Sequence, residues 1–472
     1  MQPLVFLVLG LANGAVFASL ALALVVTHRS SGVVNFATGA IALFGAYQYA
    51  FLRQGQILDP FPGLPVTTGV GGPWPLVAAL PAAVVLSALL GLLLYGLIFR
   101  PLRTAPPVAR AVASIGVLVV ITELIARRLG TAAVSVSPVF PTSTYHIGSV
   151  HVSGDRVWFA AAVVVLGLAV AAGFRFTRFG LLTRAAAQSE KGAFVSGISP
   201  DRVAAVNWMI SCGIAGLAGI LIAPIVPLVP SAYTLFIIPG LAAAILSRFE
   251  SLGVAVAGGL AIGMIQSETS YLQAQHQWLP SSGLPELVPL LLILVVLVAR
   301  ARPLPSRGAL LQQELGRAPR PRSLLRPAIP AVGCALLALV LLHGAWRAAL
   351  LTSFILAVIS LSLVVVTGFA GQVSLAQLTL AGVAGFMLSP MTRNWGIPFP
   401  VAPLLAATVA TVIGVVVGLP ALRVRGLPVA VVTLALGVTL EALWFQNTDL
   451  VGSGGKSISG PSLFGLGLQI GN

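Results

Sequence analysis

The sequence predicts an all-α polytopic membrane protein. Of its 472 residues, 58% are hydrophobic and only 8% are charged, and its mean hydropathy is +1.02. A soluble domain carries roughly 25% charged residues, so this chain lacks the charges that cover a water-facing surface. Uncharged runs at 75–99, 157–174 and 401–421 match the ~20 residues that span a bilayer as a helix. A transmembrane barrel would instead show alternating segments of about ten residues.

Apolar runs predict about 13 to 14 membrane segments along the chain. They lie at 4–26, 33–51, 75–99, 110–126, 157–174, 204–228, 235–247, 252–267, 285–299, 328–345, 350–368, 374–391, 400–421 and 427–446. The segment at 235–247 is the shortest, and we expect it to be a half-helix or a re-entrant piece that is buried in protein.

Basic residues gather in the loops after the third, fifth and ninth segments. Because Lys and Arg are enriched in cytoplasmic loops, we place these three loops in the cytoplasm and the N-terminus outside. Arg127 and Arg128 then fall on the outer side, against this trend, and residues 131–156 form an external loop with a small hairpin. The net charge of +15 therefore reflects topology rather than nucleic-acid binding, which needs a basic patch interleaved with exposed aromatic residues.

A Pro- and Arg-rich stretch at 301–327 predicts a cytoplasmic linker between two membrane modules, 1–300 and 328–472. The modules share two sequence patterns in the same order. "SGVVNFATGAIALFGAY" begins at Ser31 and "AGQVSLAQLTLAGVAGF" at Ala370, and each is followed by a Leu-Arg pair, at Arg103 and Arg423. The predicted topology runs both copies in the same direction, which indicates parallel and not inverted repeats. The segment at 328–345 is an additional helix.

The sequence shows no catalytic or metal-binding constellation. Its five histidines are scattered, and Cys212 and Cys334 lie in separate apolar runs, so no metal cluster or disulfide framework is expected. Four carboxylates lie in or near the membrane segments: Glu123, Glu250, Glu268 and Glu441. An intramembrane carboxylate is a functional candidate, but each of these is near a segment end, where a water-facing or paired role is more common.

Polar residues stand at the start of two repeated apolar helices, among small residues. They are Asn35 and Thr38, which flank Phe36, in the first module and Gln372, Ser374 and Gln377 in the second. Small residues let helices approach closely and polar ones hydrogen-bond between helices. Two interpretations stay open: these residues join helices, or they line a translocation path.

A cytoplasmic loop at 176–203 has a distinctive layout, "FTRFGLLTRAAAQSEKGAFVSGISPDRV". Residues 184–196 are mostly helix formers, Gly197 ends the helix, and a second short helix or turn is expected at Pro200. A short Ala-rich helix flanked by charge suits docking into a groove of a partner, and an ordinary loop would not need this arrangement.

This loop resembles the coupling loop of ABC importer permeases, and it is most similar to that of the branched-chain amino acid permease family. The resemblance implies ATPase-coupling positions at Arg178, Gly180, Arg184, Ala185, Ala187, Glu190, Ala193, Gly197, Ile198, Asp201 and Arg202. Gln188-Ser189 departs from the Glu-Asn that is usual in the family. The first module as a whole resembles one permease of the family, although Arg248-Phe249-Glu250 replaces small residues.

The second module resembles the other permease of the same family, so the chain looks like two fused subunits. We expect the second to be incomplete, because the chain ends before any counterpart of 176–203. A second coupling loop would then come from a longer form of the chain or from another permease chain.

The resemblance implies an ATP-driven importer of branched-chain or related amino acids in a bacterial-type inner or plasma membrane. Cytoplasmic ATPase subunits would bind the ATP and an external binding protein would deliver substrate, whereas this chain would bind no cofactor and catalyse no reaction. Urea or a short amide is an alternative substrate. An ion-coupled secondary transporter would show inverted repeats and intramembrane charges; a non-transporting scaffold is a third possibility.

The run "GSGGKS" at 452–457 ends like a phosphate-binding loop, but residue 450 is Leu where that motif needs Gly. An apolar helix, and not a strand, precedes it. We therefore interpret Gly452, Gly454 and Gly455 as part of an external loop.

Overall fold

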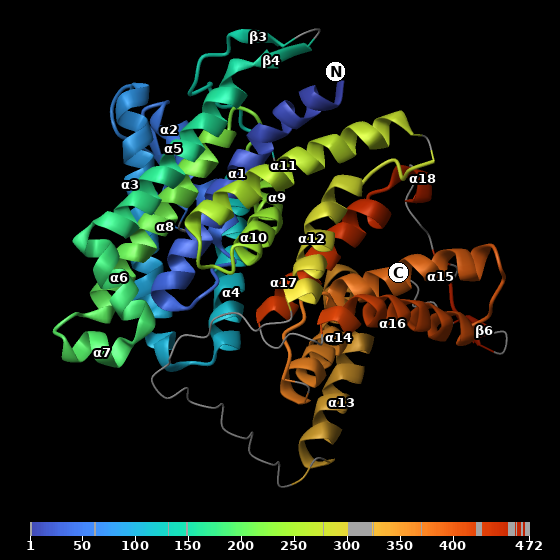
Figure 1. Cartoon of the computed structure of the whole chain (residues 1–472). Coiled ribbons are helices and arrows are strands. Elements are labelled where there is room, and N and C mark those ends of the chain that lie inside the picture. Colours follow the sequence, from blue (N-terminus) through green and yellow to red (C-terminus); the bar gives the residue numbers. More distant parts are fainter. Residues whose placement is uncertain are drawn as a thin grey trace. The chain divides into compact units, whose positions relative to one another are not determined.

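The computed structural model describes residues 2–60, 63–130, 132–147, 150–276, 278–300, 323, 325–369, 371–421, 427–451, 458, 460–463 and 466–467. The chain divides into two compact units, Met1–Gln313 and Glu314–Asn472. The boundary between them falls within the 301–327 stretch, of which all but 323 and 325–327 is outside the described residues. Both units are built almost entirely of helices (Figure 1).

Unit 1 contains twelve α-helices among its described residues. They are α1 (Gln2–Ser31), α2 (Thr38–Leu52), α3 (Leu76–Leu94), α4 (Pro107–Leu129), α5 (Gly154–Phe176), α6 (Arg178–Gln188), α7 (Glu190–Val195), α8 (Pro200–Ile222), α9 (Pro230–Leu235), α10 (Ile237–Leu246), α11 (Leu252–Gln275) and α12 (Leu284–Arg300). A π-helical turn η1 (Tyr95–Phe99) and a 3₁₀ turn η2 (Pro101–Thr104) follow α3. Two antiparallel hairpins pair β1 (Gln56–Leu58) with β2 (Thr67–Gly69), and β3 (Thr144–Ile147) with β4 (Val150–Ser153).

Unit 2 contains six α-helices among its described residues. They are α13 (Leu325–Leu341), α14 (Gly344–Val364), α15 (Gln377–Arg393), α16 (Val401–Ala421), α17 (Leu427–Leu440) and α18 (Thr448–Val451). The π-helical turns η3 (Val365–Phe369) and η4 (Glu441–Phe445) extend α14 and α17, and β5 (Ser462–Leu463) pairs with β6 (Leu466–Gly467).

The prediction of a polytopic helical membrane protein is confirmed, with fewer full crossings than expected. Eight helices of the described chain are long and apolar enough to cross a membrane, and four further apolar helices are shorter. The 235–247 segment is one of these short helices, as predicted: it forms α10 after the single turn of α9. The hairpin expected within 131–156 is β3–β4.

Two predicted segments, 33–51 and 374–391, are shorter than expected because each helix starts late. Gly32 and Gly371 both have φ +64°, the left-handed region that glycine favours, and the backbone stays non-helical until Thr38 and Gln377. The 15 residues of α2 rise only about 22 Å, which is less than the ~30 Å hydrocarbon core of a bilayer.

Helix α1 is the centre of unit 1, and it contacts α5, α8, α10 and α11. Small residues permit the closest of these approaches. A Cβ at Gly263 of α11 would stand 2.1 Å from the backbone nitrogen of Gly14, and one at Gly259 would stand 2.3 Å from that of Ala18. Such backbone-to-backbone packing replaces the hydrophobic effect as the main attraction between helices in lipid.

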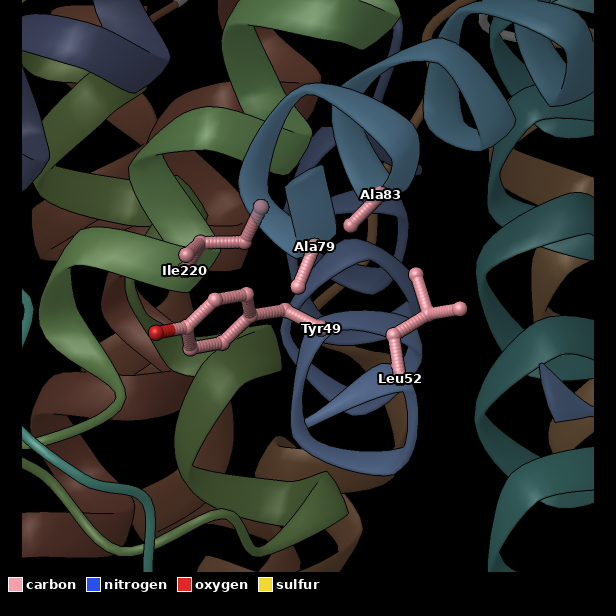
Figure 2. Close-up of a cluster of buried hydrophobic side chains, with 5 residues drawn as sticks. All are labelled: Tyr49, Leu52, Ala79, Ala83 and Ile220. Carbon is pink, nitrogen blue, oxygen red and sulfur yellow. The ribbon is translucent and has the colours of Figure 1, made fainter. Parts of the chain in front are cut away.

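Helices α2, α3 and α8 meet in a second close contact (Figure 2). Ala79 and Ala83 of α3 pack against Tyr49 and Leu52 of α2 and Ile220 of α8, all at most 1% exposed. The two alanines leave room for the Tyr49 ring, because small side chains of α3 face large side chains of α2 and α8. The β3–β4 hairpin and the α6–α7 pair lie at opposite ends of unit 1, joined by α5 (Figure 1).

Candidate functional site: the α6–α7 pair and its ionic bridge

The loop between α5 and α8 folds as two short helices because three hydroxyl side chains cap the helix starts. Thr177 accepts a hydrogen bond from the backbone N–H of Gly180, Ser189 from Gly192, and Ser199 from Arg202. N-terminal caps of this kind satisfy backbone donors that a helix leaves unpaired. The single helix predicted at 184–196 is therefore wrong: Ser189 ends α6 and starts α7. The short helix expected at Pro200 is the first turn of the long α8.

A small apolar cluster holds the two helices against α8. Ala186 of α6, Ala193 of α7 and Val203 of α8 are buried, with Leu182 and Ile198 packed beside them. The chain reverses between α7 and α8 at Gly197, which has φ +78°. The small side chains of Ala186 and Ala193, with the turn at Gly197, let the short helices α6 and α7 fold back against the start of α8.

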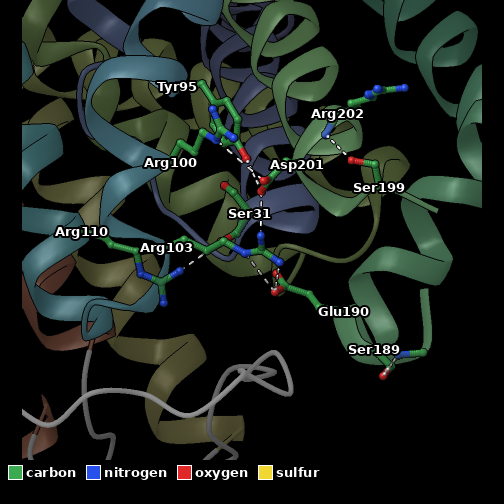
Figure 3. A network of polar contacts seen from close by, with 11 residues as sticks. Ser31, Tyr95, Arg100, Arg103, Arg110, Ser189, Glu190, Ser199, Asp201 and Arg202 are labelled. Atoms are coloured by element: carbon green, nitrogen blue, oxygen red, sulfur yellow. Dashed lines mark hydrogen bonds and ion pairs between the residues drawn. The ribbon is translucent and has the colours of Figure 1, made fainter. Parts of the chain in front are cut away.

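Arg103 connects this pair of helices to the loop after α3 (Figure 3). Its Nη2 donates to Glu190 Oε2 of α7 at 2.9 Å, and its Nη1 donates to Asp201 Oδ1 of α8 at 2.7 Å. The Tyr95 hydroxyl donates to the same Asp201 oxygen at 3.4 Å, and Arg100 Nε lies 3.7 Å from Asp201 Oδ2. One guanidinium therefore joins η2, α7 and α8, and we call the Arg103–Glu190–Asp201 cluster the ionic bridge.

The ionic bridge is only partly open to solvent, which strengthens its charge–charge contacts. The Arg103 and Glu190 side chains are 33% and 17% exposed. Burial alone would lower the pKa of Arg103, but the hydrogen bond and charge of Glu190, with the charge of Asp201, raise it overall. Arg103 therefore stays cationic at any physiological pH.

A crevice of about 20 Å³, room for about one water molecule, continues from the ionic bridge to the end of α1. Ser30, Ser31 and Val33 line it together with Arg103 and Arg110. Arg110 Nη1 donates to the Ser31 carbonyl at 3.1 Å (Figure 3). The bridge is thus adjacent to the turn between α1 and α2, where the sequence placed its first candidate path residues.

The turn between α1 and α2 is buried and held by Ser114 of α4. The Phe36 N–H donates to Ser114 Oγ at 3.2 Å, and the Ala37 N–H donates to Asn35 Oδ1 at 3.1 Å. The Thr38 hydroxyl donates to the Asn35 carbonyl at 2.6 Å. Asn35, Phe36 and Thr38 are at most 2% exposed, and Asn35 Nδ2 has no hydrogen-bond partner. The Asn35 and Thr38 side chains thus bond within the turn, and the Phe36 N–H connects the turn to α4. Both interpretations of these residues, helix contact and path lining, stay predictions.

Unit 2 contains a turn with the same hydrogen-bond pattern. The Leu375 N–H donates to Thr433 Oγ1 of α17 at 2.9 Å, and the Ala376 N–H donates to Ser374 Oγ at 3.4 Å. Gln372, Ser374 and Gln377 are half-buried there. In both turns the hydroxyl of a later helix accepts a hydrogen bond from a backbone N–H that lies two residues before the helix start, that of Phe36 or Leu375.

The structure gathers some of the predicted coupling residues and separates others. Glu190, Ala193, Ile198 and Asp201 meet at the ionic bridge or the cluster beneath it. Gly180 is buried where α6 folds back on α5, and a Cβ there would stand 2.2 Å from the Phe174 carbonyl oxygen. The remaining predicted residues lie on the surface or only partly buried: Arg178, Arg184, Ala185, Ala187 and Arg202, with Gly197 at the turn. Gly452, Gly454 and Gly455 lie outside the described residues.

Sequence reasoning missed several residues of this site. It used Arg103 as one of the basic residues that set the topology and as a landmark of the repeat, and it gave it no role in the site. It also did not single out Phe194 and Val195, which are 73% and 87% exposed at the end of α7. Two adjacent exposed apolar residues on a short helix that begins with Glu-Lys are the signal that could have identified a contact face.

The candidate carboxylates form no catalytic arrangement among the described residues. Glu123, Glu250 and Glu441 are exposed within their units, and Glu441 accepts a hydrogen bond from Gln446. Glu268 is half-buried, with one oxygen that has no hydrogen-bond partner. Within the described ranges no group of three or more His, Cys, Asp or Glu residues could hold a metal ion.

Comparison with known proteins identifies a matching family over most of the chain. The family model described as "Branched-chain amino acid transport system / permease component" matches residues 6–299 and 347–465. No solved structure matches the chain significantly.

Curated relatives of two kinds match the chain. The high-affinity branched-chain amino acid transport system permease protein LivH of Escherichia coli K12 is 25% identical over 300 residues, which cover 61% of this chain and 91% of the relative. A probable LivH of Methanocaldococcus jannaschii is 27% identical over 268 residues, covering 54% and 77%. The LivM permease protein of Salmonella typhimurium is 32% identical over 111 residues, covering 23% of this chain and 26% of the relative.

Replacing Arg103 by Met should loosen α7. Glu190 and Asp201 would lose charge-assisted hydrogen bonds worth roughly 1.5–3 kcal/mol, so amide hydrogen exchange at 189–197 should accelerate at least about tenfold. Hydrogen-exchange mass spectrometry of the purified chain measures this directly.

Arg100→Met is the matched control, because Arg100 is 65% exposed and 3.7 Å from Asp201. An exposed pair contributes only about 0–1 kcal/mol, so exchange at 189–197 should change less than about fivefold. Equal effects of the two substitutions, or no effect of Arg103→Met, would show that the ionic bridge does not hold α7.

Proposed function

The chain belongs to the family of permease components of branched-chain amino acid transport systems, and from this premise we propose that it forms the membrane path of an ATP-driven importer. It is a multi-pass membrane protein and the transmembrane component of its system, not the ATPase. The proposed substrates are branched-chain or related amino acids. The observation that carries the proposal is the α6–α7 pair, which presents an exposed face and is tied by Arg103 to the membrane helices.

The exposed end of α7 suits a contact with a cytoplasmic ATPase subunit. Phe194 and Val195 offer apolar area, and Lys191 beside them adds a charge. A short helix with apolar anchors is a common ligand for a groove in a partner protein. ATP would bind to that partner, and a binding protein would deliver substrate at the opposite, extracytoplasmic end, where the β3–β4 hairpin lies. The N-terminus would then be outside and the 301–327 stretch in the cytoplasm.

The ionic bridge supplies a route from the ATPase to the membrane helices. A partner that moves α7 also displaces Glu190, and through Arg103 it displaces η2 and the start of α8. The same crevice reaches the α1–α2 turn. ATP binding and hydrolysis by the partner would favour different positions of α7, and a difference in affinity for two states is what shifts a conformational equilibrium.

We also propose that the chain joins two permease subunits as parallel repeats. The turns at Gly32 and Gly371 have the same φ, and each turn binds a hydroxyl of the helix that follows the Leu-Arg pair, Ser114 or Thr433. Relatives named LivH and LivM both match the chain.

Within the same family, urea or a short amide is the alternative substrate class. An ion-coupled transporter and a non-transporting scaffold are less favoured, because the turns at Gly32 and Gly371 share one hydrogen-bond pattern and α7 ends on exposed apolar residues that suit a partner protein.

Transport in vesicles tests the proposal. The chain, reconstituted with its ATPase and binding protein, should import labelled leucine only when ATP is supplied, because the energy comes from the partner. Uptake driven by an ion gradient with no ATPase present would contradict the importer, and no uptake with every partner present would favour a scaffold. Uptake of labelled urea, and not of labelled leucine, would show that the substrates are urea or short amides instead of branched-chain amino acids.

Cutting the chain between its units tests the fusion. A protease site inserted within 301–322 and cleaved after reconstitution should leave uptake unchanged, because each unit has its own packed helices and exposed linkers carry few contacts. The same protease on the chain without the site is the control. Loss of uptake on cleavage would mean that the two units do not act as separate subunits.

A further inference from the structure

A second hollow of unit 1, which plays no part in the ionic bridge, is lined by three arginines. Arg29 at the end of α1, Arg175 at the end of α5 and Arg184 of α6 surround about 400 Å³ together with Glu250 and the first residues of α11. Three arginines and one carboxylate line the hollow, which leaves an excess of positive charge, although the Arg175 guanidinium lies over the Phe176 ring.

The positive charges in this hollow are only partly offset by the described protein, through Glu250. None of the three arginines forms an ion pair with a described carboxylate, although Arg29 is half-buried and interacts electrostatically with both Arg184 and Glu250. Arg184 donates instead to the backbone carbonyl of Phe174 at 3.0 Å, which fixes its guanidinium at the end of α5. Like charges held together in a partly buried site repel each other, so the arrangement favours an added anion.

The donor geometry of arginine indicates which kind of anion would bind in the hollow. Its planar fork of N–H donors matches the oxygens of phosphate, and several such forks can share one group. A phosphate group would lie between Arg29 and Arg184 and offset their mutual repulsion.

The position of the hollow favours a phosphate that belongs to a lipid. Three candidate membrane spans meet there: Val5–Ser31 and Gly154–Phe176 end at it, and Leu252–Gln275 begins at it. Basic pockets between membrane helices on the cytoplasmic side bind lipid head groups.

An apolar stripe on α5 leads directly into the hollow. Val164, Leu168, Ala171 and Arg175 follow one another at spacings of three or four residues, which places them on one helix face. Val164 and Leu168 are 37% and 66% exposed within the unit, and Ala171 and Arg175 line the hollow. A molecule with an anionic head group and apolar chains fits a basic hollow that continues into an apolar helix face.

We propose that the hollow formed by Arg29, Arg175 and Arg184 binds the phosphate of an anionic phospholipid, whose acyl chains lie along α5. The bound head group links α6 to the ends of α1 and α5, so it anchors the α6–α7 pair to the membrane surface. The site does not depend on the identity of the transported substrate.

Lipid retention by the intact chain tests the site. The full chain is purified from nanodiscs of phosphatidylcholine and phosphatidylglycerol, and native mass spectrometry counts the phospholipids that stay bound. The wild-type chain should retain phosphatidylglycerol in preference to phosphatidylcholine, and Arg29→Gln should lower that preference about tenfold, the effect of one lost charge-assisted contact. Arg175→Gln, at an exposed position, should also lower the preference for phosphatidylglycerol.

Arg178→Gln is the matched control, because it removes the same charge from α6 at an exposed position outside the hollow. It should leave the lipid preference within about twofold of wild type. Equal retention by wild type, Arg29→Gln and Arg175→Gln would overturn the proposal. A separate experiment adds inorganic phosphate to the chain in phosphatidylcholine nanodiscs and measures its thermal stability. If phosphate stabilises the wild type but not Arg29→Gln, and the wild type shows no preference for phosphatidylglycerol, the lipid proposal is overturned and the hollow binds a free anion.

Discussion

One guanidinium group connects the α6–α7 pair to the loop after α3 and to α8. Arg103 lies in a four-residue 3₁₀ turn, and its two terminal nitrogens contact carboxylates on two different helices. Lysine would provide a single point of charge, whereas the fork of arginine binds two partners in defined directions. Without this group α7 would be held mainly by the small apolar cluster around Ala193, which is non-directional and covers little area.

The rest of unit 1 is closely packed and resists deformation, so a displacement at the ionic bridge would pass on to other helices. Helix α1 packs backbone against backbone on α11 at Gly14 and Gly263, and Ala79 of α3 packs on Tyr49 of α2. Closely packed interiors transmit displacement instead of absorbing it. In the proposed mechanism, a movement of α7 would reach the end of α1 through the ionic bridge and the Arg110 contact with the Ser31 carbonyl.

Local features of the fold were readable from the sequence, whereas the contacts that assemble the site were not. Hydropathy predicted the long helices, and Gly197 predicted the reversal after α7, because each depends on residues close together in the chain. The break at Ser189 was missed because Ala-rich flanks favour a continuous helix, and capping by Ser189 outweighs that preference. The two late helix starts depend on the backbone of Gly32 and Gly371. Arg103 meets its partners across 87 and 98 positions, and helical periodicity carries no information about such pairs.

We propose that the ionic bridge couples ATP hydrolysis by the partner to movement of the membrane helices. The most direct test is the number of substrate molecules imported per ATP hydrolysed, measured for wild type and Arg103→Gln in the same reconstituted vesicles. With Arg103→Gln, the ATPase partner should still hydrolyse ATP, but about tenfold less substrate should be imported per ATP, in line with the loss of about 1.4 kcal/mol of coupling. An unchanged ratio, with hydrolysis and import equal to wild type or lowered in proportion, would contradict it.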